Sequence, residues 1–256
     1  GQALLLKGRQ LDPRALIAAA GADVADIDTW RRPVAIVLST GDELVEPGKA
    51  RSVPGSIPES VSLGVAALIE RYGGLCIERR RVRDNVVSLR SEAARALEHA
   101  DLVVITGGAS VGERDFAKAA VEALDLELVF SKVAMKPGMP VWFGSVRGRR
   151  VVGLPGNPTS ALVTARLLLA PLVRGMAGGD PHAAILWRSA PLANALDGCG
   201  DRETFVRGRW RGSGVEELRN QDSGAQYALA DAELLIRRRP GAAAASAGQQ
   251  VDVIDF

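Results

Sequence analysis

The sequence predicts an α/β protein with a three-layer, mostly parallel sheet that carries helices on both faces, followed by a small C-terminal antiparallel β-domain. Two patterns support this prediction. From residue 33 to 178, short β-branched apolar runs alternate with segments whose apolar residues recur at helical spacing, as in parallel sheets with right-handed crossovers. From 179 to 256, short alternating runs separated by Gly, Asp and Asn replace the long helical periods, which is typical of antiparallel sheets.

The first predicted domain, residues 33–178, alternates between strands and helices. Continuous apolar runs are typical of strands buried on both faces. They predict strands at VAIVLST (34–40), LCIERRRV (75–82), LVVIT (102–106), LELVFSKVAM (126–135), PVWFGSV (140–146) and VVGLPG (151–156). Helical spacing predicts helices over 61–72, 89–100, 116–124 and 158–176. The predicted sheet should place ligands at the carboxyl ends of its strands.

The two ends of the chain lack the regular strand–helix alternation of residues 33–178. Residues 179–256 contain the alternating runs ETFVRGRW, AELLIRRR and QQVDVIDF, which predict the β-domain. Residues 1–32 predict a short hairpin and one helix with little core of their own, so we interpret them as part of something larger.

Composition excludes several classes of protein. The chain has 256 residues, 47% of them apolar, and a mean hydropathy near zero, which is typical of a globular domain. Its long apolar run ALVTARLLLAPLV is interrupted by Arg166 and Pro171 and is shorter than the roughly 20 residues of a membrane helix, so no membrane span is expected. A net charge of +2 gives no support for nucleic-acid binding. Two cysteines do not make a disulfide framework, so a cytoplasmic location is expected.

Charged residues follow four of the predicted strands. Glu43, Asp84, Asp115 and Lys136 each come shortly after a strand end, so a parallel sheet should bring them to one edge. Like charges that meet there need a cation or a substrate to compensate them. Alternatives remain open for single residues, because Asp84 and Asp115 each precede a helix and could act as N-caps, and Glu43 could be a solvated loop residue.

The loop ITGGASVGERDF, residues 105–116, follows a buried strand. Gly107, Gly108 and Gly112 allow successive backbone N–H groups to face one concavity, which is typical of phosphate-binding nests, and Ser110 adds a hydroxyl donor. The neighbouring acids favour Mg²⁺, which binds hard oxygen ligands and bridges carboxylates to phosphate. A glycine-rich turn between strand and helix is also common without any ligand.

A second loop, GLPGNPTSA, has similar chemistry at the start of the last predicted helix. Asn157 can cap this helix, Pro158 fits its first turn, and Gly156 leaves free N–H groups directed at the same edge. The alternative is an ordinary helix start.

Four motifs in order, STGDEL, ITGGASVGERDF, KVAMKPGMPVWFG and GLPGNPTSALV, resemble the molybdopterin-binding domain of the molybdopterin molybdenumtransferase family, which includes MoeA and the E domain of gephyrin. GDRETFVRG and NQDSGAQ resemble the family's C-terminal β-domain. Residues 1–32 resemble the remnant of its elongated N-terminal domain or the linker that follows. The resemblance implies the molybdopterin-binding fold over 33–178 and the β-domain over 179–256.

The resemblance implies a function in molybdenum cofactor biosynthesis. Members of the family take adenylylated molybdopterin and molybdate, cleave the adenylyl group in a Mg²⁺-dependent step, and insert molybdenum with release of AMP. Matching positions imply catalytic and metal-binding roles for Glu43, Asp84 and Asp115. They also imply molybdate contacts for Arg202 and Ser223, whose alternative reading is a surface strand and a turn serine. The implied substrate-binding residues are Thr40, Gly107, Gly108, Ser110, Gly112, Lys132, Lys136, Pro155 and Pro158.

The sequence also departs from the family pattern. Met139 stands where the family often has a second lysine, and Val61 stands where it usually has asparagine. The domains that precede residue 1 in the family, which build its dimer, are absent from this sequence, which is either a fragment or a naturally short protein. Three functions stay open: a molybdenum-inserting enzyme, a non-catalytic molybdopterin or cofactor carrier, and a scaffold like gephyrin. The implied partners are a second copy of the chain and a molybdoenzyme or another protein of the cofactor pathway.

Overall fold

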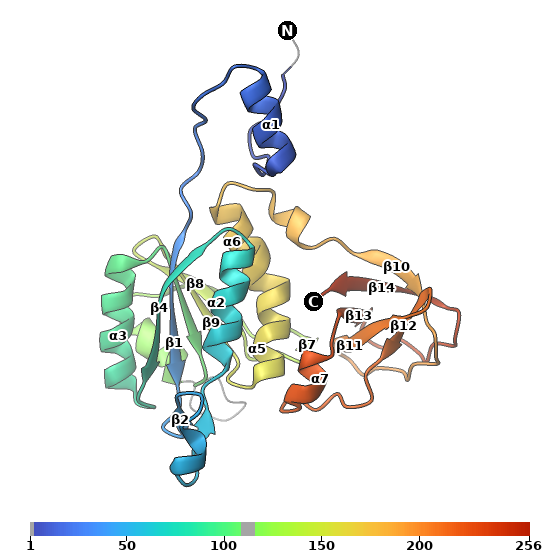
Figure 1. Cartoon of the computed structure of the whole chain (residues 1–256). Helices are drawn as coiled ribbons and strands as arrows, with labels where there is room; N and C mark the ends of the chain where they lie inside the picture. Colours follow the sequence, from blue (N-terminus) through green and yellow to red (C-terminus); the bar gives the residue numbers. More distant parts are fainter. Residues whose placement is uncertain (1–2, 109–115) are drawn as a thin grey trace.

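A six-stranded sheet forms the centre of the larger part of the molecule (Figure 1). The computed structural model describes residues 3–108 and 116–256. The strand order is β4-β1-β5-β9-β8-β6, in which β8 runs antiparallel to both of its neighbours and β4, β1, β5 and β9 are parallel. The strands are β1 (Val34–Thr40), β4 (Leu75–Val82), β5 (Leu102–Thr106), β6 (Glu127–Ser131), β8 (Trp142–Val146) and β9 (Arg149–Leu154).

Alternate residues of β1 face opposite sides of the sheet and build two cores. Ala35 and Val37 belong to a core with residues of α2 (Val61–Arg71), α5 (Pro158–Thr164) and α6 (Ala170–Met176). Ile36 and Leu38 belong to a second core with residues of α3 (Val86–His99) and α4 (Phe116–Glu122). Because both faces of the strand are covered, residues Val34–Leu38 are apolar without interruption. The predicted three-layer, mostly parallel fold is confirmed.

The predicted strand over 126–135 is wrong in its second half. Strand β6 ends at Ser131, and Lys132 adopts a left-handed backbone with φ of 67°, which ends the extended run. The chain then forms the short strand β7 (Met135–Lys136), which pairs with β11 (Glu203–Arg211) in the second sheet. The apolar run 126–135 therefore contributes β6 to the central sheet and the start of β7 to the second sheet.

The predicted long helix over 158–176 is present as three consecutive segments. Helix α5 is followed by a π-helical turn, Ala165–Leu169, and then by α6. Pro171 lies in the first turn of α6. Because proline has no amide hydrogen and its ring crowds the preceding turn, the wider π turn accommodates it.

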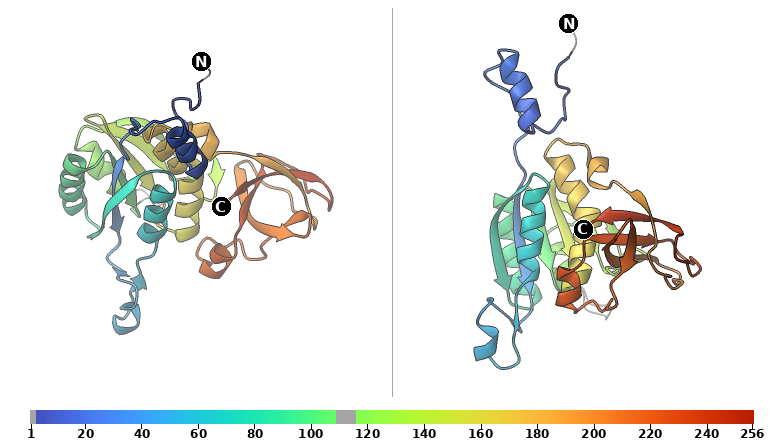
Figure 2. Two further views of the ribbon diagram at one scale, coloured as in Figure 1. Left: turned by 45° about the horizontal axis from the view of Figure 1, so that its top comes forward. Right: turned by 45° about the vertical axis from the view of Figure 1, so that its right-hand side comes forward.

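The C-terminal sheet lies beside α5 on the side away from α3 (Figures 1 and 2). Its order is β10-β14-β13-β11-β12, with antiparallel pairs throughout and β7 added to β11, so the predicted antiparallel sheet is confirmed. Phe205, Leu235 and Ile254 pack with Val163 of α5 in a shared core. The remaining elements are β10 (Arg188–Pro191), β12 (Gly214–Glu217), β13 (Leu234–Arg238), β14 (Gln250–Asp255), helix α7 (Gln226–Ala230) and the 3-10 helix Pro181–Ala184.

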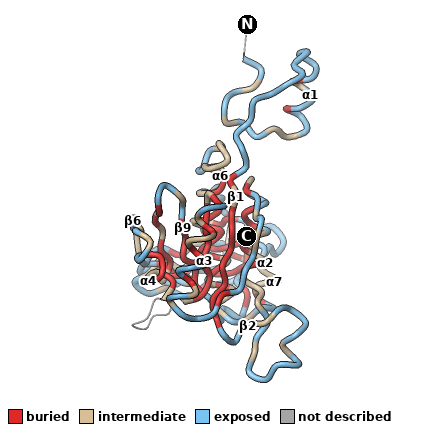
Figure 3. The backbone as a smooth tube through the Cα atoms, turned by 90° about the vertical axis from the view of Figure 1, so that its left-hand side faces the viewer, coloured by how far each residue is buried: buried red, intermediate tan, exposed pale blue. Residues whose placement is uncertain are grey.

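Two segments extend from opposite ends of the central sheet. Residues 3–33 contain helix α1 (Pro13–Gly21) and lie at the amino end of β1, where they are mostly exposed (Figure 3). The hairpin predicted there is wrong for the described residues, since 3–33 contain no strand. At the carboxyl end of β1, residues 41–60 form an excursion with β2 (Leu44–Val45), the 3-10 helix Ala50–Ser52 and β3 (Ile57–Pro58). Within the described residues, no helix is long and apolar enough to cross a membrane.

Candidate functional site

The carboxyl ends of β1, β5 and β9 meet at one edge of the central sheet. Ser39 pairs with Thr106, and Thr106 pairs with Leu154, so the residues that follow each strand lie close together. The amide of Gly107 donates to the carbonyl of Leu154 at 3.3 Å. The α5 N-terminus, α7 and the β2 excursion lie at this same end of the sheet (Figure 1). The predicted ligand edge is therefore built by three adjacent strands.

Glycine is required at Gly107 by both its backbone and its neighbours. Its φ is +87°, and a Cβ there would lie 2.5 Å from the carbonyl oxygen of Thr40 and 2.8 Å from its Oγ1. A Cβ on Gly156 would lie 3.1 Å from the Cα of Gly107. The three loops thus approach each other by backbone alone, which only glycine permits. Gly108, with φ of +68°, continues the turn. Of the predicted ligands in this loop, Ser110, Gly112 and Asp115 lie outside the described residues.

Two buried side-chain oxygens at this edge have no hydrogen-bond partner among residues 3–108 and 116–256. They are Oγ1 of Thr40 and Oδ1 of Asn157. An unsatisfied buried polar atom costs about 1–3 kcal/mol, so both atoms are poised for a ligand. The predicted capping role of Asn157 is wrong, because Asn157 stands at the N-cap position of α5 but makes no capping hydrogen bond. Pro158 occupies the first turn of α5 as predicted, and Pro155 is buried beside it.

Acidic side chains gather beside the glycine turn. The amide of Asp84 donates to Oδ1 of Asp42 at 3.2 Å. The pKa of Asp84 is raised, first by burial and then by the negative charges of Asp42 and Glu43. The structure therefore brings Glu43 and Asp84 together and adds Asp42, which the sequence places at the same strand end but which is not among the predicted site residues. Among residues 3–108 and 116–256, no three acids, histidines or cysteines form a metal-binding group.

The alternative reading of Asp84 as a helix cap is wrong. The N-cap of α3 is Asn85, whose side chain accepts from the amide of Ser88 at 2.8 Å. Asp84 precedes the cap and is therefore free to face the edge, where its amide meets Asp42.

A chain of polar contacts, buried at Thr106 and Ser39 and partly exposed beyond them, supports the strands beneath the edge. Oγ1 of Thr106 donates to Oγ of Ser39 at 3.2 Å, and Ser39 donates to Glu59 at 3.2 Å. Glu59 also accepts from the amide of Ser62 at 2.8 Å at the start of α2. Arg79 of β4 donates to Ser62 at 3.2 Å. The sequence reasoning missed this network, whose only local signal is a serine and a threonine at the ends of otherwise apolar strands.

The two predicted lysines lie along one continuous segment. Lys132 follows β6, whose carboxyl end is at the ligand edge because β6 and β9 both run antiparallel to β8. Lys136 lies on β7 opposite Thr204 of β11. Both lysines are exposed, and within the described part of the chain neither ammonium forms an ion pair. A Cβ on Gly138 would lie 2.2 Å from Oγ1 of Thr164, so this loop packs closely on α5.

Arg202 and Ser223 contact the α/β part at two different points. A guanidinium nitrogen of Arg202 lies 3.9 Å from the sulfur of Met139, in the lysine loop. The carbonyl of Ser223 accepts from the amide of Thr159, in the first turn of α5, at 3.4 Å. Both residues are half-buried at the junction of the two sheets. Ser223 lies in a turn, in agreement with its alternative reading, but this turn is docked on α5.

The fold and the edge site define a class: a doubly covered α/β domain with a glycine-lined ligand edge, joined to an antiparallel β-domain. Residues 36–175 match the family described as a probable molybdopterin binding domain, and residues 189–256 match the MoeA C-terminal region, domain IV. The chain therefore belongs to the MoeA family.

Named relatives agree with this membership. The chain is 37% identical over 196 residues to a molybdopterin molybdenumtransferase of Haemophilus influenzae, with 77% of this chain and 47% of the relative covered. It is 35% identical to molybdopterin molybdenumtransferase 2 of Mycobacterium tuberculosis, covering 81% of this chain and 52% of the relative. The crystal structure of a Pyrococcus molybdopterin biosynthesis MoeA protein aligns with a TM-score of 0.84 at 29% identity, over 99% of this chain and 62% of that one. The chain thus spans about half the length of these curated relatives.

Proposed function

We propose that this chain acts in molybdenum cofactor biosynthesis by binding adenylylated molybdopterin and molybdate, and that it inserts molybdenum with release of AMP. The observation that carries the proposal is the ligand edge, where the backbones of Gly107 and Gly156 meet. Two buried oxygens there, on Thr40 and Asn157, have no hydrogen-bond partner in the described part of the chain. A pterin and its phosphates offer N–H groups and anionic oxygens, which are the partners that such an edge lacks. The named relatives are molybdopterin molybdenumtransferases.

The charges around the edge suggest how the two substrates divide the site. Lys132 and Lys136 extend from the end of β6 toward the β-domain, where their ammonium groups can bind the anionic substrate as compact point charges. Arg202 and Ser223 lie at the junction, and a guanidinium with a hydroxyl suits a tetrahedral oxyanion such as molybdate. The glycine turn with Pro155 and Pro158 would hold the phosphates and the pterin.

Mg²⁺ fits the acids of the edge. The pKa of Asp84 is raised first by burial and then by the negative charges of Asp42 and Glu43, and carboxylate oxygens are the ligands that Mg²⁺ prefers. We propose that Glu43 and Asp84 hold Mg²⁺ together with Asp115, which lies outside the described residues. When bound, the ion would neutralise the phosphate oxygens and the charge that develops on them.

The chain's own residues would do the remaining work. Glu43 and Asp84 would orient water toward the phosphate of the adenylyl group, so that the phosphoanhydride breaks and AMP leaves. The lysines would hold the substrate against the edge during this step. Arg202 and Ser223 would keep molybdate beside the two dithiolene thiols, whose sulfurs would bind molybdenum while one oxygen of molybdate leaves as water with the two thiol protons. Positioning of this kind can lower the barrier substantially.

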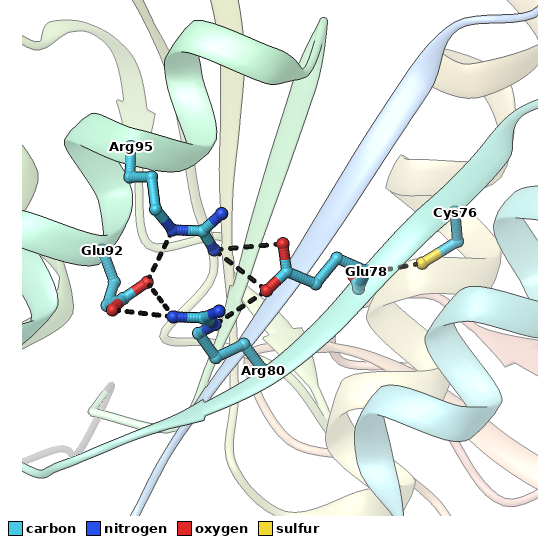
Figure 4. Close-up of polar contacts among 5 residues, drawn as sticks. All are labelled: Cys76, Glu78, Arg80, Glu92 and Arg95. Carbon is cyan, nitrogen blue, oxygen red and sulfur yellow. Dashed lines mark hydrogen bonds and ion pairs between the residues drawn. The ribbon is translucent and has the colours of Figure 1, made fainter.

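The test gives the purified chain adenylylated molybdopterin, molybdate and Mg²⁺, and follows AMP release together with reconstitution of a cofactor-free molybdoenzyme. Asp84→Asn is the site variant. Glu92→Gln is its control, because Glu92 lies on α3 in a surface ion-pair cluster with Glu78, Arg80 and Arg95 (Figure 4). We expect the wild type and Glu92→Gln to release AMP and Asp84→Asn to release at least about a hundredfold less.

Two other outcomes would change the conclusion. Tight binding of adenylylated molybdopterin without AMP release from the wild type would assign this chain the carrier function. No binding at all would refute the molybdopterin assignment. The expected homodimer and the delivery to a molybdoenzyme are further proposals, which size-exclusion chromatography and pull-down with a cofactor-free molybdoenzyme would test.

A further inference from the structure

We propose that Arg207 is a positioning residue that holds the loop of Ser223 in place for molybdate. This inference rests on the proposed function, because it assigns a cause to the position of a proposed molybdate ligand. Arg207 lies in the middle of β11 and is 1% exposed. No role for it follows from the sequence pattern, in which it is one more polar residue of an alternating strand.

The guanidinium of Arg207 binds uncharged oxygens. Its Nη2 donates to the carbonyls of Asp222 at 2.9 Å and Asn220 at 3.1 Å, and its Nη1 donates to Oγ1 of Thr159 at 3.2 Å and to the carbonyl of Ala225 at 3.5 Å. Burial lowers the pKa of Arg207, and the charge of Asp222 opposes this effect. An arginine nevertheless stays charged in a protein. The loop 220–225 is therefore gathered around a buried positive charge.

The backbone of Arg207 binds the same loop. The side chain of Gln221 accepts from the amide of Arg207 at 3.1 Å and donates to its carbonyl at 2.9 Å and to the carbonyl of Leu218 at 2.7 Å. The Gln221 side chain thus makes the two hydrogen bonds to the peptide groups of Arg207 that a neighbouring strand would otherwise make. Arg207 fixes the loop both through its guanidinium and through its peptide groups.

The same contacts place Ser223 against the α/β part. Thr159 accepts from Arg207 through its hydroxyl and donates to the carbonyl of Ser223 through its amide. Ser223 is therefore held between Asp222, which Arg207 binds, and Thr159, which Arg207 also binds. Loss of the guanidinium would release both sides of the serine at once.

Stability alone is a poor explanation for this arginine. A buried charge is costly to desolvate, and the oxygens that the Arg207 guanidinium binds are uncharged, so no ion pair among the described residues offsets this cost. In the low dielectric of the interior a positive charge beside the proposed oxyanion site is also more effective than one in water. The arrangement therefore suits anion binding better than it suits packing.

The β-domain offers a matched control in Arg238. It is 5% exposed, and its guanidinium also binds carbonyls, those of Asp197 and Ala243. Arg207 is paired with Leu235 and Arg238 with Thr204, so by strand alternation the two arginines lie on opposite faces of the sheet. Leu235 packs in the core shared with α5, whereas Ile236, on the face of Arg238, packs in the core within the β-domain. Substitution of Arg238 should therefore disturb the domain but not the junction.

The experiment measures dissociation constants by calorimetry for molybdate, with adenylylated molybdopterin present, and separately for adenylylated molybdopterin. We expect Arg207→Lys to weaken molybdate binding at least about tenfold, because an ammonium cannot reproduce the planar fork of donors. Binding of adenylylated molybdopterin should change less than about twofold, and Arg238→Lys should leave both constants unchanged. A general loss of folding would raise the dissociation constants for molybdate and for adenylylated molybdopterin together. A rise in the molybdate constant alone is therefore specific to a positioning role.

Gln221→Ala gives an independent measurement if Arg207→Lys does not fold. Gln221 is exposed, and its removal loosens the loop while the buried charge stays in place. We expect weaker molybdate binding and faster amide hydrogen exchange over 220–225. Unchanged molybdate affinity in Gln221→Ala or in a folded Arg207→Lys would overturn the inference.

Arg202→Ala and Ser223→Ala separate this inference from the proposed function. If these two variants lose molybdate affinity while Arg207→Lys keeps it, the positioning role is wrong and the molybdate site stands. If both keep full molybdate affinity, the proposed molybdate site itself is wrong, and the positioning role falls with it.

Discussion

Replacement of Asp101 should cost the protein about 2 kcal/mol of unfolding free energy at pH 7. Asp101 lies before β5 and accepts hydrogen bonds from Arg31 at 2.5 and 2.9 Å, from Arg149 at 2.7 Å and from the amide of Val34 at 2.9 Å. These contacts, first of all the hydrogen bond from Arg31, lower its pKa from 3.8 to about 2. At about 1.4 kcal/mol per pKa unit, this shift corresponds to about 2 kcal/mol.

The sign of the pH dependence follows from the lowered pKa. A carboxylate whose pKa is lower in the folded state stabilises the protein above its unfolded pKa of 3.8, and this contribution is lost as the pH falls toward 2. About half of it should survive at pH 3. We therefore expect the difference in unfolding free energy between wild type and Asp101→Asn to be largest at pH 5–7 and to shrink steadily below pH 4.

Urea denaturation followed by far-UV circular dichroism between pH 3 and pH 7 measures this difference. Glu92→Gln is the control, because the Glu92 side chain is 26% exposed whereas that of Asp101 is 14% exposed, and because no backbone amide donates to Glu92 in the described residues as Val34 does to Asp101. An exposed pair contributes at most about 1 kcal/mol. A cost for Asp101→Asn no larger than that of Glu92→Gln, or one that does not shrink in acid, would refute the reasoning.

Three further substitutions test the fold and the site. Gly107→Ala forces a side chain into a left-handed backbone and against Thr40, so we expect at least about tenfold weaker binding of adenylylated molybdopterin with a native circular dichroism spectrum. Gly153→Ala places a Cβ 2.0 Å from the buried indole of Trp142 and should lower the unfolding free energy by about 1–3 kcal/mol, measured in urea. Lys136→Ala should weaken binding of adenylylated molybdopterin and flatten its dependence on salt, because one screened charge contact is lost; unchanged titrations at 50 and 300 mM NaCl would contradict this.

The sequence predicts the central sheet well because its strands are buried on both faces. A run such as VAIVLST can be placed only where helices cover both sides, and the structure has these two cores. The ends of such runs then locate the ligand edge. Thr40, Gly107 and Gly156 could be assigned to one place before the structure was known, because parallel strands end at the same side of a sheet.

Contacts that join distant segments left no such signal. The strand predicted over 126–135 divides at Lys132 because β7 is taken into the second sheet by β11, and this pairing cannot be read from an apolar run. Arg207 reads as an exposed residue of an alternating strand. Its burial depends on Asn220, 13 residues later, and on Thr159, 48 residues earlier.

The same contacts explain why the proposed substrate site, with its lysines and its molybdate ligands, belongs to neither part of the chain alone. Strand β7 carries Lys136 into the second sheet beside Thr204, and Arg207 of that sheet reaches back to Thr159 of α5. Each part thus carries a proposed ligand whose position is set by the other: Lys136, proposed to bind adenylylated molybdopterin, is fixed by pairing with β11, and Ser223, proposed to bind molybdate, is fixed by the first turn of α5. A site divided in this way senses any shift between the two sheets. Its affinity for molybdate should therefore depend on buried residues at the junction as strongly as on the residues that contact the anion.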